Sequence, residues 1–346
     1  MSSETPALSQ AIKKLAARED LTTVEAEEAF VEVMEGRASD IQKSALLMGL
    51  RAKGETPAEV AGGVRALRRA MIEVPVPDRD SAIDTCGTGG GMTTFNISTA
   101  AAFVVAAGGV PVAKHGNRSF SSRCGSADVL EALGVTFALE PQQLGEILKE
   151  VGLSFLFAQS LHPAMRHLGP VRRELGTPTI MNLLGPITNP ARVRRQVVGV
   201  ADPSTLSLVA GALADLGHIR ALVVHGEPGL DELSPLGVNE MVKVSDGTTE
   251  PATLDPVSEL GWTGLDSSEL AGGEPADNAR VIEAVLRGRG ARAARAAVSL
   301  NAAAGFYVAG VSATVVEGVE RGEAILDEGK GFEKLEALRE ATRRAA

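Results

Sequence analysis

The sequence predicts an α/β protein with a small N-terminal helical domain, a large α/β domain built on a mainly parallel central sheet, and a helical C-terminal part. Helix-start signals crowd into the first 75 of the 346 residues. Strand-like and helix-like segments then alternate up to residue 244, which is typical of a parallel sheet covered by helices. Alanine-rich helical segments fill the rest. We expect two domains, residues 1–75 and 76–346, joined at the proline-broken segment Val74–Pro77.

Three capping boxes mark the N-terminal helices, each with a Ser or Thr followed three positions later by Glu or Gln. They are Thr22 with Glu25, Ser39 with Gln42, and Thr56 with Glu59. An earlier helix is expected over residues 7–17, completing a group of four. Helices around residues 163–190 are candidates to complete the small domain, whose apolar faces could close either a core or a subunit interface.

The larger domain alternates strands and helices. Strands are expected over 82–86, 110–114, 154–157, 196–200, 220–224 and 239–244, with helices near 98–107, 126–133, 141–150, 163–174 and 203–216. The C-terminal helices are expected at about 276–287, 291–308, 311–327 and 331–344. Ligands of such sheets bind outside the carboxyl ends of the strands, so the loops that follow the strands are where a site is expected.

The composition argues against several classes of function. The formal net charge is −10 and 3% of the residues are aromatic, so neither a basic field nor stacking platforms favour nucleic-acid binding. No apolar run approaches the roughly 20 residues that span a bilayer, and the N-terminus lacks a signal-peptide core. Two cysteines without a disulfide framework suit a reducing compartment. We expect a cytoplasmic protein with no nucleic-acid or membrane partner.

A glycine-rich turn follows the first expected strand, with glycines at positions 87, 89, 90 and 91. Backbone N–H groups bare of side chains, at the start of a helix, can hold an anion. Further donors follow at Thr93, Thr94, Asn96, Ser98 and Thr99. The turn lacks both the Walker A lysine and the dinucleotide-binding glycine spacing. The glycines alone would suit a plain strand-to-helix turn equally well.

A second loop changes this balance. Lys114, His115, Asn117, Arg118 and Arg123 follow the second expected strand, together with several serines. Two anion-holding loops after neighbouring strands predict one large, highly charged ligand, such as a polyphosphate or a phosphosugar.

Two further groups could contribute to such a site. Asp231 and Glu232 follow a buried strand, where adjacent carboxylates suit Mg²⁺ shared with substrate phosphates; a solvated acidic turn is the alternative. Arg172 and Arg173 could present a guanidinium to a carboxylate, and spacing does not rank them. His162 could line an acceptor channel or cap a helix.

Four segments in this order resemble anthranilate phosphoribosyltransferases of tryptophan biosynthesis, over nearly the whole chain. They are Gly-Thr-Gly-Gly at 87–90, Asn-Ile-Ser-Thr at 96–99, Lys-His-Gly-Asn-Arg at 114–118, and Gly-Ser-Ala-Asp-Val-Leu-Glu-Ala-Leu-Gly at 125–134. The resemblance implies Mg²⁺-dependent transfer of the phosphoribosyl group of phosphoribosyl pyrophosphate to the amine of anthranilate. It also implies a homodimer formed through the N-terminal helical domain.

The resemblance assigns residues to this chemistry. It implies contacts to phosphoribosyl pyrophosphate at Gly87, Gly90, Gly91, Thr94, Asn96, Ile97, Ser98, Thr99, Lys114, His115, Gly116, Asn117, Arg118, Ser119, Phe120, Ser121, Ser122 and Ser126. It implies anthranilate contacts at Gly87, Asn117, His162 and Arg172, and Mg²⁺ ligands at Ser98, Asp231 and Glu232, with two ions per site. No catalytic acid or base is assigned, because the nucleophile is the substrate's own amine.

One position departs from the family pattern. Gly91 stands where the family usually has Asp, in a loop one residue shorter. Two alternative functions are carried alongside the transferase: a pyrimidine nucleoside phosphorylase of the same fold, which would use free phosphate and not require Asp231 and Glu232, and a non-enzymatic relative that binds nucleic acid.

Overall fold

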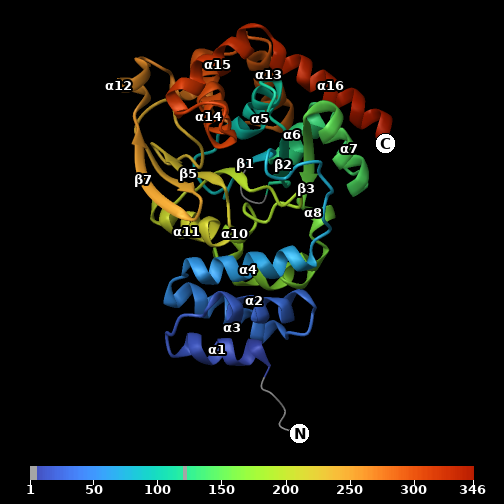
Figure 1. The fold of residues 1–346 in the computed structure, drawn as a ribbon, viewed down its shortest axis with the longest axis vertical. Helices are drawn as coiled ribbons and strands as arrows, with labels where there is room; N and C mark the ends of the chain where they lie inside the picture. Colours follow the sequence, from blue (N-terminus) through green and yellow to red (C-terminus); the bar gives the residue numbers. More distant parts are fainter. Residues whose placement is uncertain (1–5, 120–122) are drawn as a thin grey trace.

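The structure is a computed structural model that describes residues 6–119 and 123–346. The N-terminal helices lie in the lower unit in Figure 1. They are α1 (Ala7–Ala16), α2 (Thr23–Met34), α3 (Asp40–Lys53) and α4 (Pro57–Ala70). All three expected capping boxes are formed, at Thr22, Ser39 and Thr56. Gly62 lets α2 and α4 pack closely, because a Cβ there would lie 2.5 Å from the Thr23 carbonyl oxygen.

A seven-stranded sheet forms the centre of the upper unit, in the order β3-β2-β1-β4-β5-β6-β7. The strands are β1 (Ile83–Gly87), β2 (Val112–Gly116), β3 (Leu153–Phe157), β4 (Arg195–Gly199), β5 (Arg220–Gly226), β6 (Asn239–Ser245) and β7 (Thr248–Leu254). The first five are parallel, and β6 and β7 are antiparallel. The six expected strands are confirmed within one or two residues. Strand β7 was not expected, because it is an exposed edge strand that contains Pro251 and lacks an apolar alternation.

Helices cover both faces of the sheet (Figure 1). Successive residues of β4 and β5 point to opposite faces. Val197 and Leu222 pack with the C-terminal helices, whereas Val198 and Val223 pack with α4 and α11 (Leu206–Asp215). The first face carries α5 (Ile97–Ala107), α13 (Pro275–Leu286), α14 (Arg292–Ala309), α15 (Val315–Asp327) and α16 (Lys330–Ala345). Further helices of this unit are α6 (Ser126–Ala132), α7 (Pro141–Val151) and α12 (Pro256–Leu260).

The segment between β3 and β4 differs from expectation. The single helix expected over 163–174 is divided into a 3-10 helix, Pro163–His167, and α9, Gly169–Leu175, flanked by α8 (Ala158–Leu161) and α10 (Met181–Leu184). Gly169 and Pro170 interrupt the helix, because Pro170 has no N–H to donate. Apolar residues of α9 and α10, among them Val171 and Leu184, share one core with α1–α4.

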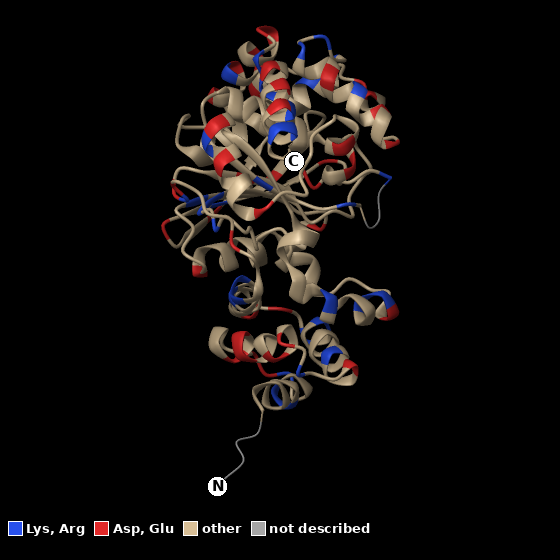
Figure 2. Cartoon of the chain, turned by 90° about the vertical axis from the view of Figure 1, so that its right-hand side faces the viewer, with Lys and Arg blue, Asp and Glu red and all other residues tan. Residues whose placement is uncertain are grey.

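Charged residues of both signs lie side by side on the C-terminal helices (Figure 2). Arg295 pairs with Asp327 and Arg344 with Glu150. The surface of these helices is therefore mixed in charge, with an acidic side chain beside Arg295. Across the described ranges, the structure contains no helix with the length and apolar character needed to cross a membrane.

Candidate active site

The sheet order brings the ligand loops together. Strands β2, β1, β4 and β5 are consecutive neighbours, so the loops after β1, β2 and β5 leave the same edge of the sheet. The loop after β5 folds back across the ends of β1 and β4. Gly87 and Gly199 lie opposite each other there. A Cβ at Gly87 would lie 2.5 Å from Asp231 Oδ2, and one at Gly199 would overlap the Asp231 carbonyl oxygen. Both positions must be glycine for the acidic loop to lie across the strands.

The acidic pair contacts the glycine-rich turn and the start of α5. Gly89 N donates to Asp231 Oδ2 at 2.7 Å, and Ser98 N donates to Glu232 Oε1 at 3.1 Å. Desolvation raises the pKa of Asp231. Desolvation, reinforced by the charge of Asp231, raises the pKa of Glu232 to about 8, against the lowering effect of Lys114. Ionising both carboxyl groups therefore costs free energy, and a bound cation would offset that cost.

Lys114 is the lysine whose charge acts on Glu232. Its side chain is buried, and its Nζ donates to the Thr85 carbonyl at 2.5 Å and approaches the Ser98 hydroxyl at 3.4 Å. Ser98 therefore contacts both Lys114 and Glu232. Three residues expected at the site, Ser98, Lys114 and Glu232, are brought together from three different segments.

The donor set suits a hard cation. No cluster of three or more His, Cys, Asp and Glu side chains forms a metal cage among residues 6–119 and 123–346. Mg²⁺ in phosphate-transfer sites does not need one, because it takes one or two carboxylates and completes its shell with water and substrate oxygens. Asp231, Glu232 and the Ser98 hydroxyl supply only oxygen atoms, so the residues present fit Mg²⁺.

A histidine pair joins the end of β2 to the segment that follows α8. His115 Nε2 and His162 Nε2 are 3.2 Å apart, with ring centroids 5.1 Å apart. Burial holds the pKa of His115 well below its ordinary value and lowers that of His162 to about 4. Both rings are therefore neutral at pH 7, and one Nε2–H donates to the other ring. His115 N also donates to Asp84 Oδ1 at 3.0 Å. Sequence reasoning did not single out Asp84, a buried carboxylate at the centre of the sheet.

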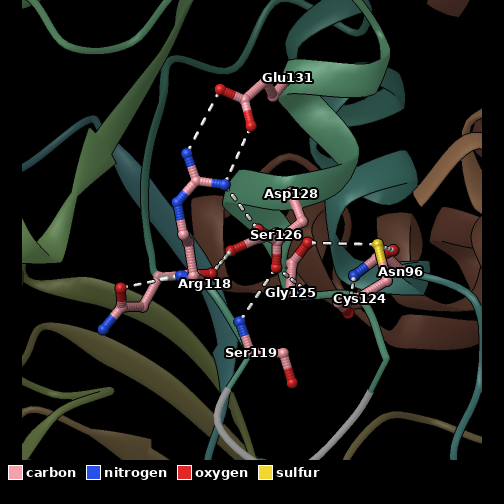
Figure 3. Close-up of polar contacts among 9 residues, drawn as sticks. Asn96, Arg118, Ser119, Cys124, Gly125, Ser126, Asp128 and Glu131 are labelled. Carbon is pink, nitrogen blue, oxygen red and sulfur yellow. Dashed lines mark hydrogen bonds and ion pairs between the residues drawn. The ribbon is translucent and has the colours of Figure 1, made fainter. Parts of the chain in front are cut away.

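The second loop is held by an acidic side chain (Figure 3). Asp128 Oδ2 accepts from Gly125 N at 2.9 Å and Ser119 N at 3.1 Å, which joins the two ends of the loop. Arg118 pairs with Asp128 at 2.7 Å and with Glu131 at 2.9 Å. The Arg118 guanidinium thus lies against α6. Phe120, Ser121 and Ser122, also expected to bind the substrate, lie outside the described residues.

Among the other expected phosphate contacts, Ile97 and Thr99 have buried side chains, whereas Gly116 ends β2 and Asn117 begins the loop after it. The Ile97 side chain is fully buried in the core, so only its backbone can face a ligand. Thr99 is buried too, and its Oγ1 has no hydrogen-bond partner among the described residues. It lines a cavity of about 10 Å³ with Phe103, Lys114 and Phe155. Asn117 accepts from Ser126 Oγ through its carbonyl at 3.2 Å. Gly116 must be small, because a Cβ there would overlap Ser126 Oγ.

The two arginines that spacing did not rank now differ. Arg173 is exposed, whereas Arg172 is partly buried. Burial alone lowers the pKa of Arg172, and no acidic residue in the described part of the chain pairs with its guanidinium. A half-buried cation without an anion is suited to bind a carboxylate ligand.

The sequence of the chain is similar to those of known proteins. Residues 79–332 match a family described as "Glycosyl transferase family, a/b domain", and residues 9–71 match "Glycosyl transferase family, helical bundle domain". An anthranilate phosphoribosyltransferase of Desulforudis audaxviator is 49% identical over 337 residues, covering 97% of this chain and 96% of the relative. One of Rubrobacter xylanophilus is 45% identical over 340 residues, covering 98% of each chain.

Solved structures are similar as well. The crystal structure of anthranilate phosphoribosyltransferase from Thermus thermophilus is 45% identical, with a TM-score of 0.90 over 96% of this chain and 99% of that one. The Saccharomyces cerevisiae enzyme in complex with phosphoribosyl pyrophosphate and Mg is 25% identical, with a TM-score of 0.87 over 97% and 98%. The same enzyme in complex with 4-fluoroanthranilate also has a TM-score of 0.87 at 25% identity, over 99% and 100% of the two chains.

Proposed function

The chain belongs to the anthranilate phosphoribosyltransferase family, and we propose that it transfers the phosphoribosyl group of phosphoribosyl pyrophosphate to the amine of anthranilate. The products are N-(5-phosphoribosyl)anthranilate and pyrophosphate, and the step belongs to tryptophan biosynthesis. The observation that carries this proposal is the meeting of the glycine-rich turn, Lys114 and the acidic pair at one edge of the sheet.

The sugar diphosphate is proposed to bind between the glycine-rich turn and the loop after β2. Gly89 and Gly90 have φ values of 69° and 88°, and a Cβ at either would meet no atom within 4 Å. The side of each Cα on which a side chain would stand is open, so a phosphate can approach the turn there, while Gly89 N stays bound to Asp231 Oδ2. The N-terminal end of α5 adds the positive end of the helix dipole, which favours a phosphate there.

Magnesium would be held by Asp231, Glu232 and Ser98, and we keep two ions per site as a proposal. When bound, magnesium neutralises charge that develops on the departing pyrophosphate. The protein holds the two carboxylates against Gly89 N and Ser98 N, so their positions are fixed before the substrate arrives. Lys114 adds a fixed positive charge beside Ser98.

Anthranilate is proposed to bind near Gly87, Asn117, His162 and Arg172. The Arg172 guanidinium supplies the counter-charge for the carboxylate. The His162 ring is neutral at pH 7, because burial lowers its pKa to about 4, so it does not compete as a cation. The attacking group is the anthranilate amine, and the site's contribution is to hold that amine in line with the anomeric carbon.

The test is the loss of anthranilate fluorescence with purified protein, phosphoribosyl pyrophosphate and Mg²⁺. We expect fluorescence to fall only when all three are present and to stay constant with a chelator. Constant fluorescence at every Mg²⁺ concentration would contradict the proposal. Phosphorolysis of thymidine or uridine by the same preparation would favour the phosphorylase alternative instead.

A homodimer formed through the helical domain is proposed as well. Ile41 on α3 is 83% exposed and Val24 on α2 is 58% exposed, although both are large apolar residues. Burial of these side chains against a second copy would remove that apolar surface from water. Analytical ultracentrifugation should give twice the chain mass of 35.8 kDa, and Ile41→Glu should shift the equilibrium toward the monomer. A monomeric unmodified protein would contradict this.

A cytoplasmic location also stays a proposal.

A further inference from the structure

A segment of the C-terminal part runs along the glycine-rich turn. Phe95 N donates to the Leu270 carbonyl at 3.0 Å, and Gly272 N donates to the Thr93 carbonyl at 3.2 Å. Between these bonds, Thr94 and Ala271 form an isolated antiparallel bridge. Contact is so close that a Cβ at residue 272 would overlap the Thr94 carbonyl oxygen. The turn that leads into α5 is therefore supported by residues about 180 positions later in the chain, which have no motif in the sequence.

Asn278 on α13 ends this segment and continues the support through its side chain. It is 2% exposed. Its Oδ1 accepts from Gly273 N at 2.8 Å, and its Nδ2 donates to Asn96 Oδ1 at 3.0 Å. Asn96 Nδ2 in turn donates to the Cys124 carbonyl at 3.1 Å. Asn96 lies beside Cys124 in Figure 3.

Backbone groups fix the direction of this chain of bonds. The Gly273 N–H can only donate, so the amide oxygen of Asn278 must face it. The Cys124 carbonyl can only accept, so the Asn96 NH₂ group must face that end. The bond between the two amides then runs from Asn278 Nδ2 to Asn96 Oδ1. No other orientation of either amide satisfies the Gly273 N–H, the Cys124 carbonyl and the bond between the two side chains at once. Each side chain therefore holds the other in one orientation.

The chain of bonds joins two ligand loops. Asn96 is the residue before the first turn of α5, two positions before Ser98. Cys124 lies at the end of the loop after β2, next to Gly125, which Asp128 holds. Resting on the proposed function, we propose that Asn278 is a positioning residue for phosphoribosyl transfer. It sets the distance between the anion cradle at α5 and the loop after β2, and it touches neither substrate.

Asn278→Asp tests this proposal with the smallest change in shape. The aspartate keeps an acceptor for Gly273 N but turns a second acceptor toward Asn96 Oδ1, so the bond between the two side chains is replaced by repulsion. Ala276→Asp is the matched control, because Ala276 is exposed in the first turn of the same helix and gains the same charge. Asn278→Ala removes the side chain without adding charge.

Two measurements read out the result. We expect Asn278→Asp to raise the KM for phosphoribosyl pyrophosphate about three- to tenfold, the scale of one lost hydrogen bond, with the KM for anthranilate changed less than about twofold. In Asn278→Ala, which adds no charge beside the Cys124 thiol, we also expect Cys124 to react faster with a thiol reagent than in the unmodified protein, because Asn96 then holds Cys124 less firmly. The rate at Cys86, which is buried at the end of β1 beside Pro186, should stay constant and serves as the internal reference.

Several results would overturn the proposal. One is a KM for phosphoribosyl pyrophosphate in Asn278→Asp that matches that of Ala276→Asp, together with a Cys124 rate in Asn278→Ala that matches that of the unmodified protein. Another is an equal change of both KM values together with a lower Tm in both Asn278 variants, which would make the residue structural only. An unmodified protein without transferase activity would contradict the proposed function itself, and faster reaction of Cys124 in Asn278→Ala would still show the link between the loops.

Discussion

At the scale of single residues, Gly91 carries the departure from the family pattern. Met92 N donates to the Gly229 carbonyl at 2.9 Å, and a Cβ at Gly91 would lie 2.7 Å from that carbonyl and 3.2 Å from Asp231 N. The shorter turn is therefore drawn against the loop that carries the acidic pair. A glycine fits this close approach, and any side chain must push the two loops apart.

Gly91→Asp is expected to act on the diphosphate side of the site. The substitution should change the Mg²⁺ optimum or the apparent affinity for phosphoribosyl pyrophosphate more than the affinity for anthranilate, because residue 91 contacts the loop of Asp231. Gly91→Ala is the matched control, since it adds the Cβ without the carboxylate. Steady-state kinetics over a Mg²⁺ series separates the two contributions. Equal effects of Gly91→Asp on both substrates would count against this role of the turn.

Asp231→Asn combined with Glu232→Gln is expected to abolish metal-dependent turnover while the protein stays folded. Both amides keep an oxygen for Gly89 N and Ser98 N, and burial disfavours both charges. We expect kcat/KM to fall about 100-fold or more, on the scale of losing one electrostatic stabiliser, with an unchanged or higher Tm. Glu240→Gln, an exposed acid on β6, is the control. Retained Mg²⁺-dependent turnover in the double variant would contradict the assigned ligands.

At the scale of elements, Glu59 holds the helical domain together. It is fully buried, and it accepts from Leu21 N and Thr56 N, both at 2.9 Å. Lys53 Nζ lies 3.1 Å from its second oxygen. One side chain thus caps α4, fixes the chain before α2 and pairs with the charge of Lys53 in the last turn of α3. The capping box predicted from sequence is correct, but its Glu also has this long-range role.

Glu59→Gln is expected to destabilise the protein by about 1–3 kcal/mol, because it turns an NH₂ group toward a buried N–H donor and leaves Asp20 as the remaining anionic partner of Lys53. Urea denaturation measures the change. Glu28→Gln, at an exposed position on α2, should change the free energy of unfolding by less than about 0.5 kcal/mol. Equal effects of the two substitutions would show that Glu59 is an ordinary surface cap.

At the scale of the whole molecule, buried titratable groups couple stability to pH in opposite directions. His218 is 1% exposed, and burial lowers its pKa to about 3. The folded state therefore binds its proton more weakly than the unfolded chain does. Stability from this histidine is present above the unfolded pKa near 6.5 and is lost as the pH falls below it. Glu232 acts the other way, because its folded pKa is raised to about 8.

The difference between the unmodified protein and His218→Asn isolates the histidine. From pH 7 to pH 5, the unmodified protein should lose about 2 kcal/mol more of its free energy of unfolding than the variant does. Urea denaturation at the two pH values provides the measurement. Parallel pH curves for the two proteins would mean that His218 is protonated in the folded state.

Local features of the chain determined most of its elements. The capping boxes at Thr22, Ser39 and Thr56 start helices where expected, because a cap satisfies donors within four residues and needs no distant partner. The segment 163–174 and strand β7 were less accessible to such reasoning. Gly169 and Pro170 interrupt the first, and the second gains its strand structure from pairing with β6.

By itself, the sequence determined the fold class, the family and the types of residue at the strand ends, since glycines, hydroxyls and carboxylates have chemistry that does not depend on distant contacts. Only the tertiary structure decided which of them meet. It placed Asp231 across Gly87 and Gly199, turned Arg118 toward Asp128 and Glu131, and brought Asn278 to Asn96. These contacts join residues from different parts of the chain through the order and register of the strands, and that order is set by the packing of the whole sheet.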